Sequence, residues 1–144
     1  RIGMSDRVIE ELDEAECVGL IAPGGIGRIA YQGRFGPAVL PVNYRLHEGA
    51  VVFRTAAHSA LDEDLQTGIS GADYQVAFEI DEFDRELRQG WSVLIQGPAH
   101  HVPEEERDSV VRAGVHPWPA GERELFVRIV PSRITVRRIR ATET

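Results

Sequence analysis

Lysine is absent from this 144-residue sequence, in which all 16 basic residues are arginine. The absence excludes Schiff-base catalysis by lysine, and any bound anion must be held by arginine side chains, hydroxyl groups or backbone N–H groups. We attribute the arginine bias to a GC-rich genome. The 23 acidic residues give a formal net charge of −7, which argues against non-specific nucleic-acid binding, because such binding needs a net basic surface.

Cysteine is nearly absent as well. The one cysteine, Cys17, cannot form a disulfide within the chain, which is typical of a reducing compartment. No apolar run approaches the length of a membrane span, and no signal-peptide pattern opens the sequence. We therefore expect a cytoplasmic protein without a membrane partner, folded as a single domain over residues 1–144. Residues 1–3 precede Met4 and are interpreted as a vector remnant, outside the fold prediction.

Catalytic and metal-binding motifs are also missing. The sequence contains no Gly-x-Ser-x-Gly turn, and Cys17 lies in an apolar helical context that is typical of a buried structural cysteine. His100 and His101 are neighbours in a predicted strand, so their side chains point to opposite faces, and the other histidines show no ligand spacing relative to them. The glycines of residues 24–27 follow a helix and precede a strand, whereas a dinucleotide-binding loop has the reverse order. The sequence thus predicts no triad and no metal site.

Short strands make up most of what is present. Apolar alternation and turn residues predict six or seven strands, at 26–31, 38–46, 50–55, 74–80, 91–102, 125–130 and 134–139. Capping residues predict three short helices, at 13–22, from Ser59 to before Gly68, and from Pro103 to about residue 113.

The connections between the strands indicate how the sheet is arranged. Pro41 lacks an N–H group and predicts an edge or bulged strand, the charges of residues 81–89 predict a loop, and Gly97-Pro98 predicts a late break in the strand that starts at Trp91. Tight turns favour a mainly antiparallel sheet, and closure into a barrel would remove its edges. We therefore predict a mainly β fold with short helices, arranged as an antiparallel barrel.

One segment carries groups suited to holding a phosphate. A predicted strand ends at Arg54 and Thr55, and a predicted helix begins at Ser59. An arginine fork, two hydroxyl groups and the N–H groups of a helix N-terminus together can bind a phosphate without lysine. The same residues also fit a surface arginine beside an ordinary helix cap, and the pattern alone leaves both interpretations open.

The two tryptophans leave a similar choice. Trp91 starts a predicted strand, and Trp118 lies between two prolines in a rigid loop. Tryptophans at such places stack on ligands or partners, and equally often belong to the core.

Five segments resemble, in order and spacing, those of the pyridoxamine 5′-phosphate oxidase-like flavin-binding split barrels, in the branch that includes the nitroimidazole-resistance proteins. The segments are Gly27–Tyr31, Leu40–Tyr44, Val51–Thr55, Val76–Asp81 and Gly90–Leu94. The resemblance continues through 117–118, 121–123 and 127–129, and so covers nearly the whole chain. It implies a six-stranded split barrel, a homodimer, and FMN bound in two equivalent clefts between the subunits.

The resemblance also assigns ten residues to the cofactor site. Those expected at the FMN phosphate are Arg54, Thr55 and Ser59. Those expected along the isoalloxazine edge, partly through backbone atoms, are Val42, Asn43 and Tyr44. Those expected from the partner subunit are Trp91 and Ser92, and those expected near the cleft mouth are Trp118 and Arg123.

The chain departs from the family pattern at one position. Relatives commonly have glycine, then serine or threonine, then lysine just after the Arg-Thr pair, whereas this chain has His58-Ser59-Ala60. The loss of one charge-assisted contact costs about 1.5–3 kcal/mol, or about one to two decades in affinity. His58 compensates only when it is protonated, which is partial at neutral pH. We therefore expect either weakened FMN binding or another occupant, such as a reduced deazaflavin or haem.

Two functions of different classes follow from the resemblance. The first is an FMN-dependent oxidoreductase, in which the flavin exchanges electrons with a small-molecule donor and acceptor while the protein orients it. Tyr44 and His58 are the candidate proton donors. The alternative is a non-catalytic protein that binds or stores flavin, deazaflavin or haem. Oxidation of pyridoxamine phosphate itself is disfavoured, because no second set of basic residues for a substrate phosphate is evident.

Overall fold

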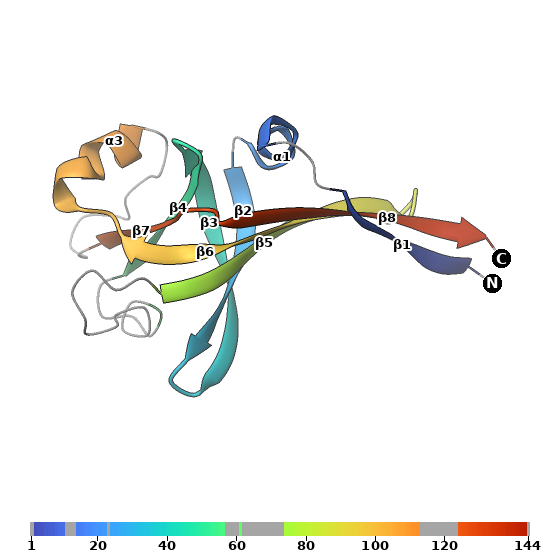
Figure 1. Cartoon of the computed structure of the whole chain (residues 1–144), viewed down its shortest axis with the longest axis horizontal. Coiled ribbons are helices and arrows are strands. Elements are labelled where there is room, and N and C mark those ends of the chain that lie inside the picture. Colours follow the sequence, from blue (N-terminus) through green and yellow to red (C-terminus); the bar gives the residue numbers. More distant parts are fainter. Residues whose placement is uncertain are drawn as a thin grey trace.

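The computed structural model describes residues 2–10, 14–22, 24–56, 61, 74–112 and 124–143, and strands dominate it (Figure 1). In chain order the strands are β1 (Ile2–Glu10), β2 (Gly24–Gly33), β3 (Gly36–His47), β4 (Ala50–Ala56), β5 (Tyr74–Asp84), β6 (Gln89–His101), β7 (Glu124–Ile129) and β8 (Arg133–Glu143). The helices are α1 (Glu14–Ile21) and a short 3₁₀ turn, η1 (Glu104–Glu106), that continues into α3 (Arg107–Arg112).

Six of the strands close into an antiparallel barrel. They are hydrogen-bonded in the order β6-β5-β2-β3-β4-β7, and β7 pairs with β6 to complete the circle. Alternate side chains point inward and form one apolar core, in which Phe78 stacks on Phe53 with ring centroids 6.2 Å apart. The prediction of a mainly β, six-stranded antiparallel barrel with short helices is confirmed.

The helices of the described residues agree with the sequence. The α1 helix ends at Ile21, just before Pro23-Gly24-Gly25, as the turn residues predict. The third predicted helix is η1 followed by α3. The second predicted helix, from Ser59, lies outside the described residues except for Leu61, which is helical and buried.

β6 changes its partner part-way along its length. Its first eight residues pair with β8 and its last three with β7, and Gly97 and Pro98 lie between these two regions. There the chain that connects β7 to β8 runs beside β6 on the same edge, and the register shifts between the pairs Ala99–Ile129 and Gln96–Arg133. The Ser132 N–H donates to the Gln96 carbonyl at 2.8 Å, and a Cβ on Gly97 would collide with the Val130 carbonyl oxygen. The predicted break at Gly97-Pro98 is therefore wrong. The strand is continuous, and the two residues mark the change of partner.

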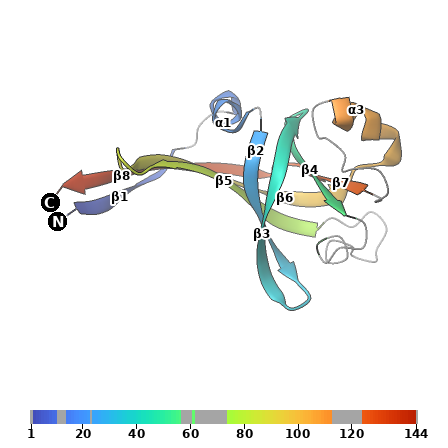
Figure 2. The ribbon, with the colours of Figure 1, turned by 180° about the vertical axis from the view of Figure 1, so that it is seen from behind.

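β1 and β8 form a ribbon that extends away from the barrel (Figures 1 and 2), where Ile2 pairs with Glu143. No sequence pattern predicted β1, and the exclusion of residues 2–3 from the fold was wrong, because both belong to β1 and pair with β8. Treating residues 81–89 as a loop was also wrong, because β5 runs to Asp84 and only residues 85–88 form the turn. The hairpin that β5 and β6 form is exposed along residues 81–89. Strands that are solvated on both faces need no apolar alternation, so the pattern that reveals a strand is missing there.

β3 and β4 separate at one end of the barrel. β3 pairs with β2 from Gly36 to Arg45 but with β4 only from Tyr44 to His47. Pro41 thus lies where β3 has one partner strand among the described residues, which agrees with the predicted edge position. Beyond Tyr44 the two strands diverge and leave one side of β3 without a neighbouring described strand.

Candidate functional site

The candidate site lies at this separation of β3 and β4. Continuing the register of the β3–β4 ladder beyond Tyr44 and Phe53 would bring Asn43 beside Arg54, but the ladder ends there. Seven of the ten predicted site residues are described: Val42, Asn43, Tyr44, Arg54, Thr55, Trp91 and Ser92. Three of them, Ser59, Trp118 and Arg123, lie outside the described residues, as do His58 and Ala60.

On β3, the predicted residues alternate between the core and the solvent. Val42 is half-buried against the core, Asn43 is exposed, and Tyr44 is buried at 3%. The Tyr44 ring packs edge-on against Phe78 at 5.4 Å, and its hydroxyl donates to the Ile21 carbonyl at 2.6 Å, which ties α1 to the barrel. Burial raises the pKa of the Tyr44 hydroxyl. That hydroxyl is therefore a structural donor, engaged within the chain, and the Tyr44 backbone lies between its partners Gly25 of β2 and Phe53 of β4.

On β4, Arg54 and Thr55 point to opposite faces of the strand. Thr55 lies on the core side at 7% exposure, two residues after the buried Phe53 and on the same face of the strand. Arg54 is half-buried on the outer side, directly opposite Phe126 of β7. Both side chains can reach one anion only at the end of β4, where the strand stops and the two faces meet.

A small second core lies on the outer side of β4, beneath α3. Val52, Val110 and Phe126 are buried there together, and the guanidinium carbon of Arg107 lies 5.2 Å from the centroid of the Phe126 ring. The sequence analysis did not single out Arg107. No local pattern could have done so, because its contact with Phe126, the residue opposite Arg54, depends on how β4 pairs with β7 and on where α3 folds back.

Trp91 and Ser92 lie far from Arg54 within one chain. Trp91 is half-buried at the start of β6, where β6 pairs with β8, and packs against the chain's own core. The opposite end of β6 is the one near β4, since the Val102 N–H donates to the Phe126 carbonyl at 2.7 Å. At about 3.3 Å per residue, the stretch from Trp91 to Val102 spans on the order of 35 Å. A single chain therefore does not bring the two groups together.

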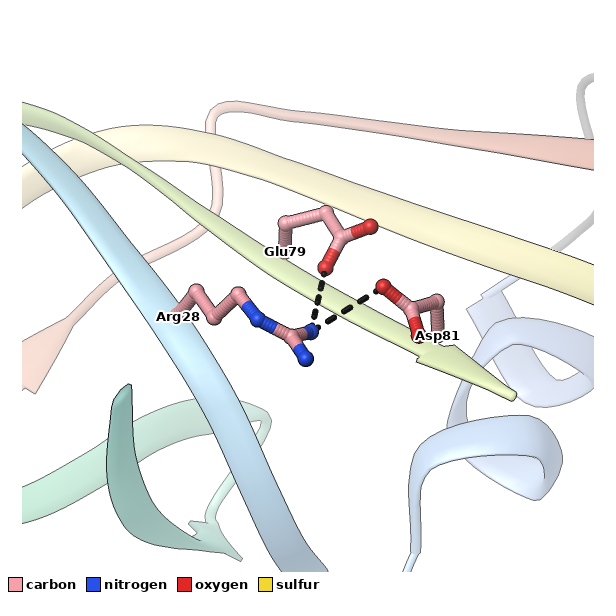
Figure 3. A network of polar contacts seen from close by, with 3 residues as sticks. All are labelled: Arg28, Glu79 and Asp81. Atoms are coloured by element: carbon pink, nitrogen blue, oxygen red, sulfur yellow. Dashed lines mark hydrogen bonds and ion pairs between the residues drawn. The ribbon is translucent and has the colours of Figure 1, made fainter. Parts of the chain in front are cut away.

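Arg28, Glu79 and Asp81 form a polar network on the outer face of β2 and β5 (Figure 3). The Arg28 guanidinium donates to Glu79 at 3.3 Å and to Asp81 at 3.0 Å. Burial, and then the neighbouring Asp81 carboxylate, raise the pKa of Glu79 to about 7, although Arg28 acts in the opposite direction. Glu79 therefore changes its charge near neutral pH. The sequence analysis used Arg28 and Glu79 only as parts of family motifs.

Apolar side chains are exposed on the β2–β3 hairpin. Ile26 and Val39 are each 62% exposed, and Phe35 at the hairpin tip is 97% exposed. Beside them a shallow cavity of about 420 Å³ lies on β2, β3 and β5, with Ala30 and Ala77 in its wall. Another cavity, of about 450 Å³, is lined by Cys17, Glu48 and the β7–β8 connection. Neither cavity includes Arg54 or Thr55.

Within the described ranges, no three histidine, cysteine, aspartate or glutamate side chains are grouped so that they could hold a metal ion. In the same ranges, no helix is both long enough and apolar enough to span a membrane.

Comparison with known proteins identifies relatives over nearly the full length. The family model described as pyridoxamine 5′-phosphate oxidase matches residues 13–138. An uncharacterised protein of Mycobacterium tuberculosis is 32% identical over 135 residues, which cover 94% of this chain and 88% of that protein.

Solved structures agree with this assignment. The structure of an FAD-binding protein from Mycobacterium smegmatis is similar with a TM-score of 0.72 and 31% identity, over 91% of this chain and 98% of the other. A candidate pyridoxamine 5′-phosphate oxidase from Corynebacterium glutamicum is similar with a TM-score of 0.71 and 26% identity, over 97% and 99% of the two chains.

Proposed function

The chain belongs to the pyridoxamine 5′-phosphate oxidase family, and from that premise we propose that it is a flavin-binding protein whose site is the opening between β3 and β4. The observation that carries the proposal is the end of the β3–β4 ladder at Tyr44, beside a strand end that presents Arg54 and Thr55. A diverging strand pair leaves backbone donors and acceptors that a planar ring edge can engage.

The groups at the strand end fit the phosphate of a flavin nucleotide. Arg54 brings a forked guanidinium that matches phosphate oxygens, and Thr55 brings a hydroxyl. The backbone of residues 42–44 is suited to the polar edge of the isoalloxazine ring. The nucleotide is FMN by the resemblance, while the relative from Mycobacterium smegmatis is an FAD-binding protein. The proposal therefore covers both nucleotides, and their relative affinities distinguish them.

A second copy of the chain completes the proposed site. Because Trp91 and Arg54 are far apart in one chain, a flavin that contacts both must lie between two chains. The exposed apolar residues of the β2–β3 hairpin, Ile26, Phe35 and Val39, give such a homodimer a surface to bury. In this arrangement Trp91 and Ser92 come from the partner.

A bound flavin supplies hydride and electron transfer, which makes an oxidoreductase with a small-molecule donor and acceptor the first candidate activity. The chain's own residues bind and orient the flavin. Tyr44 is not a proton donor in this proposal, since its hydroxyl is buried and donates to Ile21. The setting is the reducing cytoplasm, where the single buried cysteine, Cys17, stays a thiol.

The alternative is a protein that binds or stores its cofactor without turnover. The engagement of the Tyr44 hydroxyl favours it, because this leaves the described part of the site without an identified acid or base. Deazaflavin and haem are the other cofactors of this alternative.

The test is an equilibrium titration of the purified protein with FMN, FAD and riboflavin, followed by gel filtration and a visible spectrum. Retention of about one flavin per chain, on a species with the mass of a dimer, supports the proposal. If none of the three flavins is retained or changes fluorescence, the proposal is wrong. For a protein that binds flavin, anaerobic mixing with nicotinamide and deazaflavin donors separates the two functions, because only an oxidoreductase shows rapid bleaching of the flavin band.

A further inference from the structure

The residues expected at the FMN phosphate include one permanent positive charge, that of Arg54. Ala60 stands where relatives commonly have lysine, and the chain has no lysine at all. Besides Arg123, which lies outside the described residues, a second permanent positive charge must come from another arginine. Among the residues that the structure describes, we look for it on an element packed near the end of β4.

The β4–β7 ladder identifies the neighbourhood of Arg54. Arg54 lies directly opposite Phe126, and side chains opposite each other in an antiparallel pair lie on the same face, with Cβ atoms about 4.5–5.5 Å apart. Val52 confirms which face this is, since it is two residues from Arg54 and is buried with Phe126 beneath α3. The Arg54 side chain therefore lies beside the Phe126 ring, on the side of the barrel that α3 covers.

Arg107 lies against the same ring. It is the first residue of α3, and its guanidinium carbon is 5.2 Å from the Phe126 centroid. Contact with an aromatic ring restricts an arginine while its N–H donors stay directed outward in the guanidinium plane. Phe126 thus lies opposite Arg54 of β4 and in contact with the guanidinium of Arg107 from α3. Both arginines are partly exposed, so a ligand from solvent can reach them.

A third arginine on this face has a different role. Arg128 follows Phe126 by two residues, and its guanidinium donates to Glu106 at 2.6 Å. Its charge is therefore balanced by a carboxylate of η1.

We propose that Arg107 is the second phosphate-binding arginine of the flavin site, in place of the lysine that relatives have. The inference rests on the proposed function. Two guanidinium forks from different elements match an anion with several oxygens, either the terminal phosphate of FMN or the diphosphate of FAD. Anchoring by Phe126 reduces the entropy lost when Arg107 binds the anion.

The experiment compares the affinities of FMN and riboflavin, which differ in the phosphate alone. Flavin fluorescence gives both Kd values for the wild-type protein, for Arg107→Gln and for the matched control Arg112→Gln, an exposed arginine of the same helix. We expect Arg107→Gln to weaken FMN binding about 10–100-fold and to leave riboflavin binding unchanged. Arg112→Gln should change neither. FMN binding should also depend less on salt in Arg107→Gln than in the wild type.

Arg107→Met keeps an unbranched apolar stem against Phe126 and tests the charge if the glutamine variant does not fold. An FMN affinity in either folded variant within about twofold of the wild type overturns the inference while the proposed function stands. An equal loss of FMN and riboflavin affinity also overturns it, because the effect would then be structural. If the wild type binds none of the flavins, the proposed function itself is wrong and the inference falls with it.

Discussion

Two phenylalanines of the same strand show the difference between the two halves of this molecule. Phe78 of β5 is fully buried in the barrel between Tyr44 and Phe53, whereas Phe83, five residues further along, is 46% exposed near the tip of the β5–β6 hairpin. The strand is continuous through both positions. Backbone pairing by itself therefore does not bury a side chain; inside the barrel, side chains from the facing strands surround Phe78.

Replacing each phenylalanine with alanine tests this contrast and gives the largest expected effect. Phe78→Ala removes a ring from a closed core, and we expect it to lower the free energy of unfolding by about 3–5 kcal/mol. Phe83→Ala removes a half-exposed ring and should cost about 1 kcal/mol or less. Urea denaturation followed by circular dichroism measures both changes. Similar losses in the two variants would contradict the view that the end of the β5–β6 hairpin lacks a core of its own.

The second comparison separates binding from stability. Arg54→Gln removes a guanidinium from the barrel end, and we expect FMN affinity to fall about 10–100-fold with little change in the melting temperature. Arg85→Gln, in the exposed turn between β5 and β6, should leave both quantities unchanged. Fluorescence titration and thermal melting of the two variants provide the measurements. Unchanged FMN affinity in Arg54→Gln would show that the phosphate does not bind at this end of β4.

The third prediction concerns Gly97, where β6 passes from pairing with β8 to pairing with β7. A methyl group on Gly97 collides with the Val130 carbonyl oxygen, so we expect Gly97→Ala to destabilise the protein by about 1–3 kcal/mol. Gly19 of α1 has open space around it, and Gly19→Ala should stabilise the protein by about 0.5–1 kcal/mol. Opposite signs in chemical denaturation would support the close approach of the β7–β8 connection to Gly97 of β6. A neutral Gly97→Ala would argue against it.

The smallest expected effect is a pH dependence on the outer face of the barrel. The pKa of Glu79 is raised from 4.5 to about 7, so the folded state binds more protons than the unfolded state in that interval. Its contribution to stability is fully present below about pH 4.5 and is lost as the pH rises through about 7. Partial exposure of Glu79 and Asp81 keeps the effect small.

Glu79→Gln imitates the protonated side chain and should remove this loss. We expect the melting temperature of the variant, relative to wild type, to rise between about pH 4.5 and pH 7 and then to level off. Glu82→Gln, an exposed neighbour in the same strand, is the control. A difference between Glu79→Gln and wild type that does not change with pH would contradict the assignment.

The barrel half could be predicted from the sequence because burial leaves a record in the chain. Strands with one face in the core alternate between apolar and polar residues, and turn residues such as Gly33 and Gly36 separate them. The edge position of Pro41 follows in the same way from its missing N–H group. The exposed hairpin of β5 and β6 left no such record, because residues 81–89 are solvated and lack the apolar alternation that indicates a strand. β1 was not predicted either.

The candidate site shows the same division. The sequence alone determined the fold class, the family resemblance, and the groups suited to an anion at Arg54 and Thr55. Only the tertiary structure decided that these two side chains lie on opposite faces of β4 and that Trp91 is a long way from them in one chain. It also decided that Arg107 packs on Phe126, the residue opposite Arg54. The physical reason is that side-chain alternation is a local property of the chain, whereas the neighbours of a residue across a sheet depend on the register that barrel closure imposes.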